Sequence, residues 1–243
     1  MSIVLEVCVD SFASAAAAQA GGADRLEVCS ALQLGGTTPN FGLLEQCVGE
    51  LDLPVMMMIR PHDGGFVYDS HHVDTMLADI RVARSLGVRG IVFGALTPQR
   101  NLDRETCRRL LDAAEDLETT FHRAFDLVPD PEGTLHELES LGFHRVLTSG
   151  QQSTAMAGAE LIAVLTQQAA SLQVLAGAGI DASNVRRLVE RTGVQEVHAS
   201  ASVPAGDGQS SGTIEFGSQR RVTSAAGVRA IRAALAGHDE SAI

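Results

Sequence analysis

The sequence contains the tripeptide Glu-Val-Cys twice, at residues 6–8 and at residues 27–29. Each copy lies in an apolar run of strand length, in which alternate side chains share a face. Cys8 and Cys29 would therefore take equivalent places on neighbouring strands, which lie about 4.8 Å apart. Two thiolates at that spacing could bind a soft ion such as Cu(I), with Met58 nearby as a thioether. The alternative is that both cysteines pack as small apolar residues.

The two glutamates of these tripeptides, Glu6 and Glu27, form a second pair one step deeper. Two inward carboxylates close together cannot both ionise cheaply, so the pKa of one should rise unless an arginine intervenes. With His122 and His198, whose pKa values we expect near neutrality, they could perform acid–base chemistry or ligate a divalent ion. A structural Glu–Arg network is the alternative interpretation.

Two arginines complete this candidate catalytic set. We expect Arg60 or Arg123 to pair with Glu6 or Glu27, because a buried carboxylate without a partner costs several kcal/mol. An arginine held in this way keeps N–H donors for the carboxylate or phosphate of a ligand. All 18 basic residues are Arg and none is Lys, which excludes Schiff-base chemistry on a lysine amine.

These side chains need a scaffold, and the chain alternates apolar runs of strand length with helical patterns. We expect strands near residues 3–9, 24–29, 54–60, 88–94, 119–123, 144–148, 172–176 and 195–200. Helices are expected near 11–20, 40–50, 71–86, 101–116, 132–141, 154–170, 182–192 and 223–236. Eight β-then-α units in 243 residues predict a single-domain (β/α)8 barrel. A doubly wound open sheet is the alternative.

An internal repeat supports the barrel and predicts which side chains point inward. Four segments, beginning at Gly22, Gly87, Gly142 and Gly193, each continue through an apolar residue and two variable positions into a strand. Each glycine is placed to end a helix in the left-handed conformation. Side chains that alternate with the helix-facing ones then point into the barrel. The polar residues expected at the carboxyl ends of the strands, or in the turns just after them, are Glu6, Cys8, Glu27, Cys29, Arg60, His122, Arg123, Asp126, Ser149, His198 and Ser200.

Two further segments lie at the same end of the expected barrel. Residues 176–179, Ala-Gly-Ala-Gly, follow the seventh strand and could let backbone N–H groups approach an anion, although a tight turn explains them equally well. The long segment 201–222 after strand eight gives no strand or helix signal. We expect it to be a loop that covers the site.

Composition excludes several classes of partner. The net charge of −12 argues against nucleic acid and anionic membranes. No apolar run approaches the roughly 20 residues of a membrane span, and the first residues lack the pattern of a signal peptide. Four scattered cysteines are typical of a reducing cytoplasm.

Several motifs, taken together, resemble the CutC family. They are the segments 6–11, 21–29, 35–39, 58–61, 120–126, 146–150 and 198–201. The resemblance implies a cytosolic barrel that self-associates, as a dimer or tetramer, with a role in copper homeostasis and with Cys8 and Cys29 as copper ligands. The sequence departs from the family pattern at His62, where the family usually has Arg, and at residues 176–179.

Two functions therefore stand side by side. The first is a copper-homeostasis protein that binds Cu(I) through Cys8 and Cys29. The second is an enzyme that acts on a small polar or anionic metabolite by Glu/His acid–base chemistry. A two-thiol site alone would explain neither Arg60 nor the pair His122 and Arg123.

Overall fold

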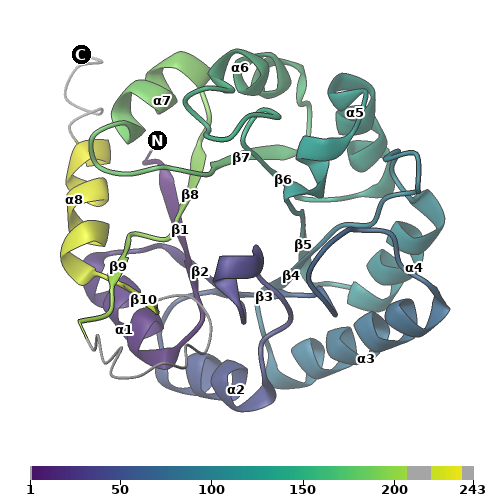
Figure 1. Cartoon of the computed structure of the whole chain (residues 1–243), viewed down its shortest axis with the longest axis horizontal. Coiled ribbons are helices and arrows are strands. Elements are labelled where there is room, and N and C mark those ends of the chain that lie inside the picture. Colours follow the sequence, from purple (N-terminus) through teal and green to yellow (C-terminus); the bar gives the residue numbers. More distant parts are fainter. Residues whose placement is uncertain (1, 207–219, 237–243) are drawn as a thin grey trace, which may run out of the picture.

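A closed barrel of eight parallel strands in chain order forms the centre of the molecule (Figure 1). The computed structural model describes residues 2–206 and 220–236. The strands are β1 Val4–Val9, β2 Arg25–Val28, β3 Val55–Met58, β4 Gly90–Phe93, β5 Glu118–Phe121, β6 Arg145–Thr148, β7 Gln173–Gly177 and β8 Glu196–Ala199. Each lies within two residues of its predicted bounds, so the predicted (β/α)8 barrel is confirmed.

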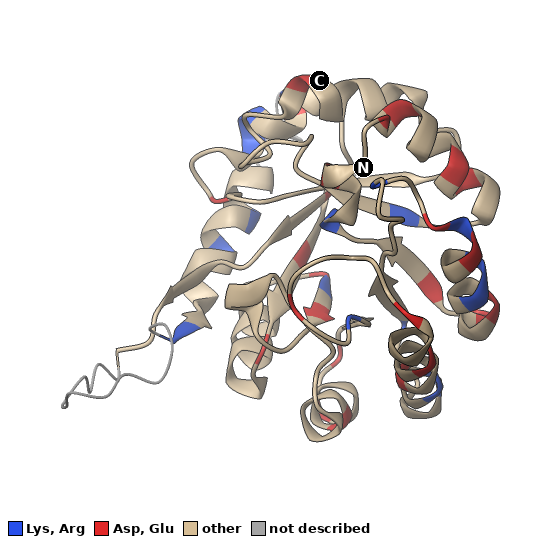
Figure 2. Cartoon of the chain, turned by 45° about the vertical axis from the view of Figure 1, so that its right-hand side comes forward, with Lys and Arg blue, Asp and Glu red and all other residues tan. Residues whose placement is uncertain are grey.

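Helices surround this barrel and are joined to it by short connections (Figure 1). They are α1 Phe12–Gly21, α2 Phe41–Glu50, α3 Ser70–Leu86, α4 Arg104–Ala114, α5 Pro131–Leu141, α6 Ala159–Gln168, α7 Val185–Thr192 and α8 Ala225–Ala236, with the 3-10 turns η1 Leu32–Leu34 and η2 Arg123–Leu127. Acidic and basic positions are both found along these outer helices (Figure 2).

The repeat behaves as the sequence predicts. Gly22, Gly87, Gly142 and Gly193 each end a helix with a φ between 70° and 91°, and each donates its N–H back to the helix. Left-handed backbone of this kind favours glycine. The four helices therefore stop at equivalent points, and the strands that follow begin in the same phase.

Two apolar layers result from the alternation along each strand. Leu26 and Val28 belong to the large layer between barrel and helices, together with Leu5, Ile91 and Val197. A smaller cluster of Cys29, Met56, Met58 and Val92 fills the inside of the barrel. The interior is thus packed rather than open, as is usual for this fold.

The stagger between neighbouring strands corrects one sequence expectation. Cys8 lies opposite Glu27 and not opposite Cys29, while Glu6 lies opposite Arg25 on one side and His198 on the other. Closing a sheet into a barrel requires such an offset. The two cysteines are therefore not level with each other, and neither are the two glutamates.

The segment after β8 also differs from its prediction. Ser202–Pro204 (β9) and Arg221–Thr223 (β10) form an antiparallel pair that contacts α1. The segment was expected to form neither strand nor helix. Its central part, 207–219, lies outside the described residues. Among the described residues, no helix combines the length and apolar character that crossing a bilayer requires.

Candidate functional site

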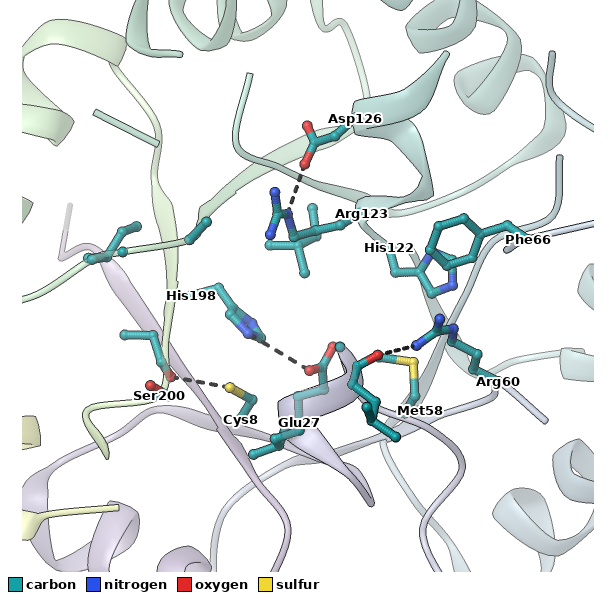
Figure 3. A pocket seen from close by; sticks show the side chains of 18 of the residues that line it. Cys8, Glu27, Met58, Arg60, Phe66, His122, Arg123, Asp126, His198 and Ser200 are labelled. Atoms are coloured by element: carbon teal, nitrogen blue, oxygen red, sulfur yellow. Dashed lines mark hydrogen bonds and ion pairs between the residues drawn. The ribbon is translucent and has the colours of Figure 1, made fainter. Parts of the chain in front are cut away.

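A pocket of about 450 Å³ opens at the carboxyl ends of the strands (Figure 3). Ala178 and Gly179, from the segment after strand seven, contribute to its rim. Its labelled side chains in Figure 3 are Cys8, Glu27, Met58, Arg60, Phe66, His122, Arg123, Asp126, His198 and Ser200. Glu6, Cys29 and Ser149, also predicted for this site, are buried just behind the pocket wall.

A thiol, a carboxylate and an imidazole meet on one wall of the pocket. One ligand atom each from Cys8, Glu27 and His198 lie within 4.8 Å of one another. His198 Nε2 lies 3.8 Å from Glu27 Oε2, and the Cys8 thiol faces the Ala199 carbonyl at 3.8 Å. The sequence predicted all three as inward residues but did not predict this particular grouping, which follows from the strand stagger.

His198 is held from behind by a buried carboxylate. Its Nδ1 lies 2.8 Å from Glu6 Oε1, and Glu6 Oε2 accepts a hydrogen bond of 2.5 Å from Arg25. Burial would raise the pKa of Glu6, but the charge of Arg25 and the contacts with His198 lower it to about 2. Burial would lower the pKa of His198, but Cys8, Glu27 and Glu6 hold it well above its usual value.

Glu27 and Cys29 share a more apolar position. The Cys29 thiol donates to Glu27 Oε2 at 3.4 Å, whereas Glu27 Oε1 has no hydrogen-bond partner among the described residues. Burial raises the pKa of Glu27. Burial and the charge of Glu27 raise the pKa of the Cys29 thiol well above its usual value. The pKa of one member of the glutamate pair, Glu27, is raised, as expected. The charge of Glu6 is compensated by Arg25 rather than by Arg60 or Arg123.

Arg60 corrects a prediction because it binds backbone and not Glu6 or Glu27. Its Nη1 donates to the carbonyls of Leu34 and Gly36, and its Nη2 to the carbonyl of Gly64. Its guanidinium also lies over the ring of Phe66, 5.0 Å from the centroid. Arg60 therefore ties the loops after β2 and β3 to the pocket rim, a role that depends on loop conformations and has no local sequence signal.

His122 is a neutral imidazole in this environment. Burial, and then the charge of Arg60, lowers its pKa to about 3, so the expectation of near neutrality is wrong for both histidines. Its Nδ1 accepts the Ala124 N–H at 3.2 Å, which leaves the ring proton on Nε2. That atom has no partner among the described residues. Gly94 makes room for the ring, since a Cβ there would lie 2.6 Å from His122 Nδ1.

Arg123 lies at the mouth and is held by neighbours on η2 and after β6. Its Nε donates to Asp126 Oδ2 and its Nη2 to Ser149 Oγ, both at 2.8 Å. Asp126 also accepts hydrogen bonds from Thr148, Ser149 and Gln151. Asp126 thus fixes the turn after β6 and orients Arg123, whose side chain remains 44% exposed.

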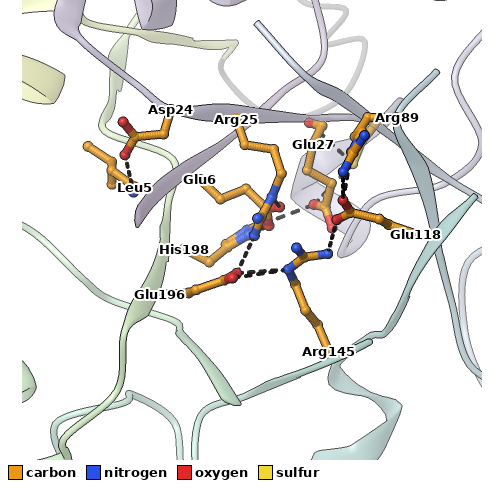
Figure 4. A network of polar contacts seen from close by, with 11 residues as sticks. Leu5, Glu6, Asp24, Arg25, Glu27, Arg89, Glu118, Arg145, Glu196 and His198 are labelled. Atoms are coloured by element: carbon orange, nitrogen blue, oxygen red, sulfur yellow. Dashed lines mark hydrogen bonds and ion pairs between the residues drawn. The ribbon is translucent and has the colours of Figure 1, made fainter. Parts of the chain in front are cut away.

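A second polar cluster lies at the amino-terminal end of the barrel, and the sequence analysis missed it (Figure 4). Arg25 bridges Glu6 and Glu196, at 2.5 Å and 2.6 Å. Arg145 bridges Glu196 and Glu118, at 2.9 Å and 2.5 Å. The signal was present, because Arg25, Arg145 and Glu196 occupy the same position of the repeat, two residues before an inward side chain.

Fold and pocket together define a (β/α)8 barrel with a ligand-sized polar pocket where barrel enzymes and binding proteins place their sites. A family model described as the CutC family matches residues 3–203. The chain therefore belongs to the CutC copper-homeostasis family.

Individual relatives agree with this assignment. A CutC family protein of Pasteurella multocida is 47% identical over 197 residues, which cover 81% of each chain. The human copper homeostasis protein cutC homolog is 47% identical over 199 residues, which cover 82% of this chain and 73% of that protein.

Solved structures agree as well. The crystal structure of a Streptococcus agalactiae protein that bears the CutC name superposes with a TM-score of 0.78 at 31% identity, covering 82% of this chain and 98% of that one. Phosphoribosylanthranilate isomerase of Pyrococcus furiosus, at 14% identity and a TM-score of 0.59, covers 97% of this chain and 99% of its own. The second likeness shows the fold alone.

Proposed function

We propose that this protein binds Cu(I) at the pocket wall, with Cys8 and Cys29 as thiolate ligands and His198 as a nitrogen ligand. The observation that carries the proposal is the close grouping of Cys8, Glu27 and His198, with the Cys29 thiol 3.4 Å from Glu27. Thiolates and imidazole are ligands that suit Cu(I). The copper-homeostasis relatives support the same reading.

The donor set fits a soft monovalent ion better than a hard divalent one. Cys29 Sγ and Met58 Cε both lie close to Gly36, where an added Cβ would be 3.3 Å and 3.5 Å from them. The Cys29 thiol and the His198 imidazole both lie near Glu27, at 3.4 Å and 3.8 Å from Oε2. Both thiols must lose their protons to bind metal, and Glu27, which already accepts from Cys29, can take up a proton from that thiol.

An anaerobic competition titration against a chromophoric Cu(I) chelator tests this proposal. The Cys8→Ser/Cys29→Ser double variant should lose the tight site, because a hydroxyl is a poor ligand for Cu(I). The matched control is Cys47→Ala/Cys107→Ala, which removes two thiols buried in the helix layer. Equal affinity in the wild type and the Cys8/Cys29 variant would remove these residues as the copper site.

A second candidate function is supported by polar side chains from both walls of the pocket. His122 Nε2, Arg60 Nε and Glu27 Oε1 are buried polar atoms without hydrogen-bond partners among the described residues, and all three residues line the cavity. Such atoms usually have partners, so a ligand that supplies them is favoured. The proposed ligand is a small polar or anionic metabolite, with Arg60, His122 and Arg123 as its binding side.

Glu27 and His198 would then supply acid–base chemistry. Burial keeps Glu27 protonated more readily than an exposed glutamate, which suits a proton donor. Inorganic phosphate is a simple probe of the anion side: it should raise the melting temperature of the wild type and of Arg104→Ala, an exposed control. It should not do so in Arg123→Ala. No shift in the wild type would count against this candidate.

The setting in which either function operates is also a proposal. A single-domain chain in the reducing cytoplasm is consistent with four free cysteines. Self-association to a dimer or tetramer rests on the family resemblance. Light scattering coupled to size-exclusion chromatography tests it, and a monomer at micromolar concentration would contradict it.

A further inference from the structure

Cys8 is placed unlike the other three cysteines of the chain. Its side chain lines the pocket and also a second cavity of about 500 Å³ under β9 and β10, whose walls include Ser200 and Thr223. Cys29, Cys47 and Cys107 are fully buried. Cys8, with 8% of its surface exposed, thus borders two cavities, whereas the remaining thiols are enclosed by the core.

The imidazole beside Cys8 is held in one orientation. His198 Nδ1 is bound to Glu6 at 2.8 Å, and Glu6 is itself fixed by Arg25 at 2.5 Å. With Nδ1 engaged, Nε2 is the ring nitrogen left to face Glu27 and Cys8 (Figure 3). A nucleophile, an imidazole that stabilises it and a carboxylate that orients the imidazole form the arrangement of covalent catalysis on unrelated folds.

We infer that Cys8 is a nucleophile that forms a covalent bond to small anionic electrophiles in this pocket. The Cys8 sulfur bonds to the electrophilic carbon, and the leaving group departs with its bonding pair. The thiol proton leaves to solvent as the S–C bond forms, and the protonated His198 faces the sulfur with Nε2, so atoms and charge balance. Glu6 is a positioning residue, since within the described part of the chain its carboxylate bonds to the imidazole and to Arg25.

The class of substrate follows from the wall opposite Cys8. Arg123 lies there with 44% of its side chain exposed. The pocket is also lined by Arg60 and by His122 (Figure 3), whose Nε2 has no hydrogen-bond partner in the described ranges. Arg60 and Arg123 carry positive charge and the neutral His122 can donate a hydrogen bond, so together they favour a carboxylate or phosphate group. This inference rests on the proposed small-molecule function of the pocket, and it adds a covalent role for Cys8.

Competitive alkylation with iodoacetamide and iodoacetate tests both parts, because the two reagents differ mainly in charge. Alkylation forms the S–C bond and releases iodide. Mass spectrometry of the native protein should find Cys8 modified first, with Cys47 and Cys107 as internal references. His198→Gln should slow Cys8 alkylation by about 10²-fold, because the variant lacks the charged imidazole that stabilises the thiolate. His136→Gln, on an exposed helix position, is the matched control and should leave the rate unchanged.

The anionic preference has its own readout. The rate with iodoacetate relative to iodoacetamide should fall several-fold in Arg123→Ala, because the cationic wall concentrates the anion. It should stay constant in Arg104→Ala. Glu6→Asp and Glu6→Gln should lower both rates together while the ratio is unchanged, and Asp should be the less impaired. A collapsed pocket would alter the ratio as well.

The outcomes separate this inference from the functions it builds on. Reaction at Cys8 no faster than at Cys47, or no effect of His198→Gln in a folded protein, overturns the nucleophile. A ratio that is indifferent to Arg123 overturns the anionic class of substrate. Failure of inorganic phosphate to stabilise the wild type, with Cys8 still reactive through His198, overturns the proposed metabolite function and leaves the nucleophile in place. Loss of copper binding would bear neither on the nucleophile nor on the anionic class of substrate.

Discussion

The two ends of the barrel contain the same residue types in opposite states. At the amino-terminal end, Arg25 and Arg145 bridge the carboxylates of Glu6, Glu118 and Glu196 (Figure 4). At the carboxyl end, Glu27 and His122 are as deeply buried but keep polar atoms without partners among the described residues (Figure 3). A neutralised network serves stability, whereas unsatisfied groups beside a cavity serve binding, and barrels divide their two ends in this way.

His198 joins the two ends. Its Nδ1 contacts Glu6, which belongs to the neutralised network, and its Nε2 faces Glu27 and Cys8 at the pocket. The network at the amino-terminal end of the barrel thus holds His198, whose Nε2 faces the pocket at the carboxyl end. We therefore predict that removing a charge at the amino-terminal end lowers the free energy of unfolding. Removing one at the carboxyl end should lower the affinity for a ligand.

The largest effect is expected at Arg25. Arg25→Met leaves Glu6 and Glu196 buried without their shared cation, so the free energy of unfolding should fall by about 3–5 kcal/mol, the usual cost of breaking a buried ion pair. Urea denaturation followed by circular dichroism measures it. Arg89→Met is the control, because its side chain is 62% exposed and should contribute less than about 1 kcal/mol. Equal losses of unfolding free energy in the two variants would contradict a stabilising role for the network at the amino-terminal end.

At the amino-terminal end of the barrel, Glu6 makes the stability of the protein depend on pH in the acid range. Its pKa is lowered from 4.5 to about 2 in the folded protein, so its stabilisation is complete above pH 4.5 and disappears as the pH falls through 2. The loss relative to Glu6→Gln should reach about 3 kcal/mol, at 1.36 kcal/mol per pKa unit. Denaturation curves of both proteins between pH 2 and 6 check it. A constant difference would mean that Glu6 does not titrate in this range.

Arg60 is an exception to this division, because it stabilises loops at the carboxyl end of the barrel. Arg60→Ala removes the donor from the carbonyls of Leu34, Gly36 and Gly64. We expect the free energy of unfolding to fall by about 2 kcal/mol. Arg104→Ala, on an exposed pair, serves as the control, measured by the same denaturation assay. No loss of stability would show that these loops do not need Arg60.

The smallest change in stability is expected at Glu27. Burial raises its pKa, so its contribution is complete below pH 4.5 and is lost as the pH rises through the raised value. Glu27→Gln should therefore match the wild type at pH 4.5 and be equal or slightly more stable at pH 7, by less than about 1 kcal/mol. Ligand and copper affinities should fall nevertheless. A marked loss of stability at pH 7 would place Glu27 with the neutralised network instead.

Local patterns were enough to predict the barrel. Helix-ending glycines such as Gly22 and Gly142, with strict alternation in the strands between helices, determine both the fold and which side chains point inward. The pairing between strands was not predictable in the same way. The stagger that places Cys8 opposite Glu27 depends on closure of all eight strands, which no single segment encodes.

The partners of the arginines show the same division. Arg25 could have been recognised as inward, because it precedes Glu27 by two residues on a strand. Arg60 could not have been assigned to the carbonyls of Leu34, Gly36 and Gly64, since these lie in loops whose conformation depends on packing around them. The sequence therefore identified most of the groups in the site but misassigned several of their partners.

Anomalous diffraction at the copper absorption edge tests the central claim most directly. Crystals grown anaerobically with Cu(I) should show one strong anomalous peak at the carboxyl end of the barrel, within bonding distance of Cys8 Sγ. Donors from Cys29 and His198 should complete its coordination. A peak only at surface histidines such as His71 or His72, or none near Cys8 at full copper loading, would contradict the account.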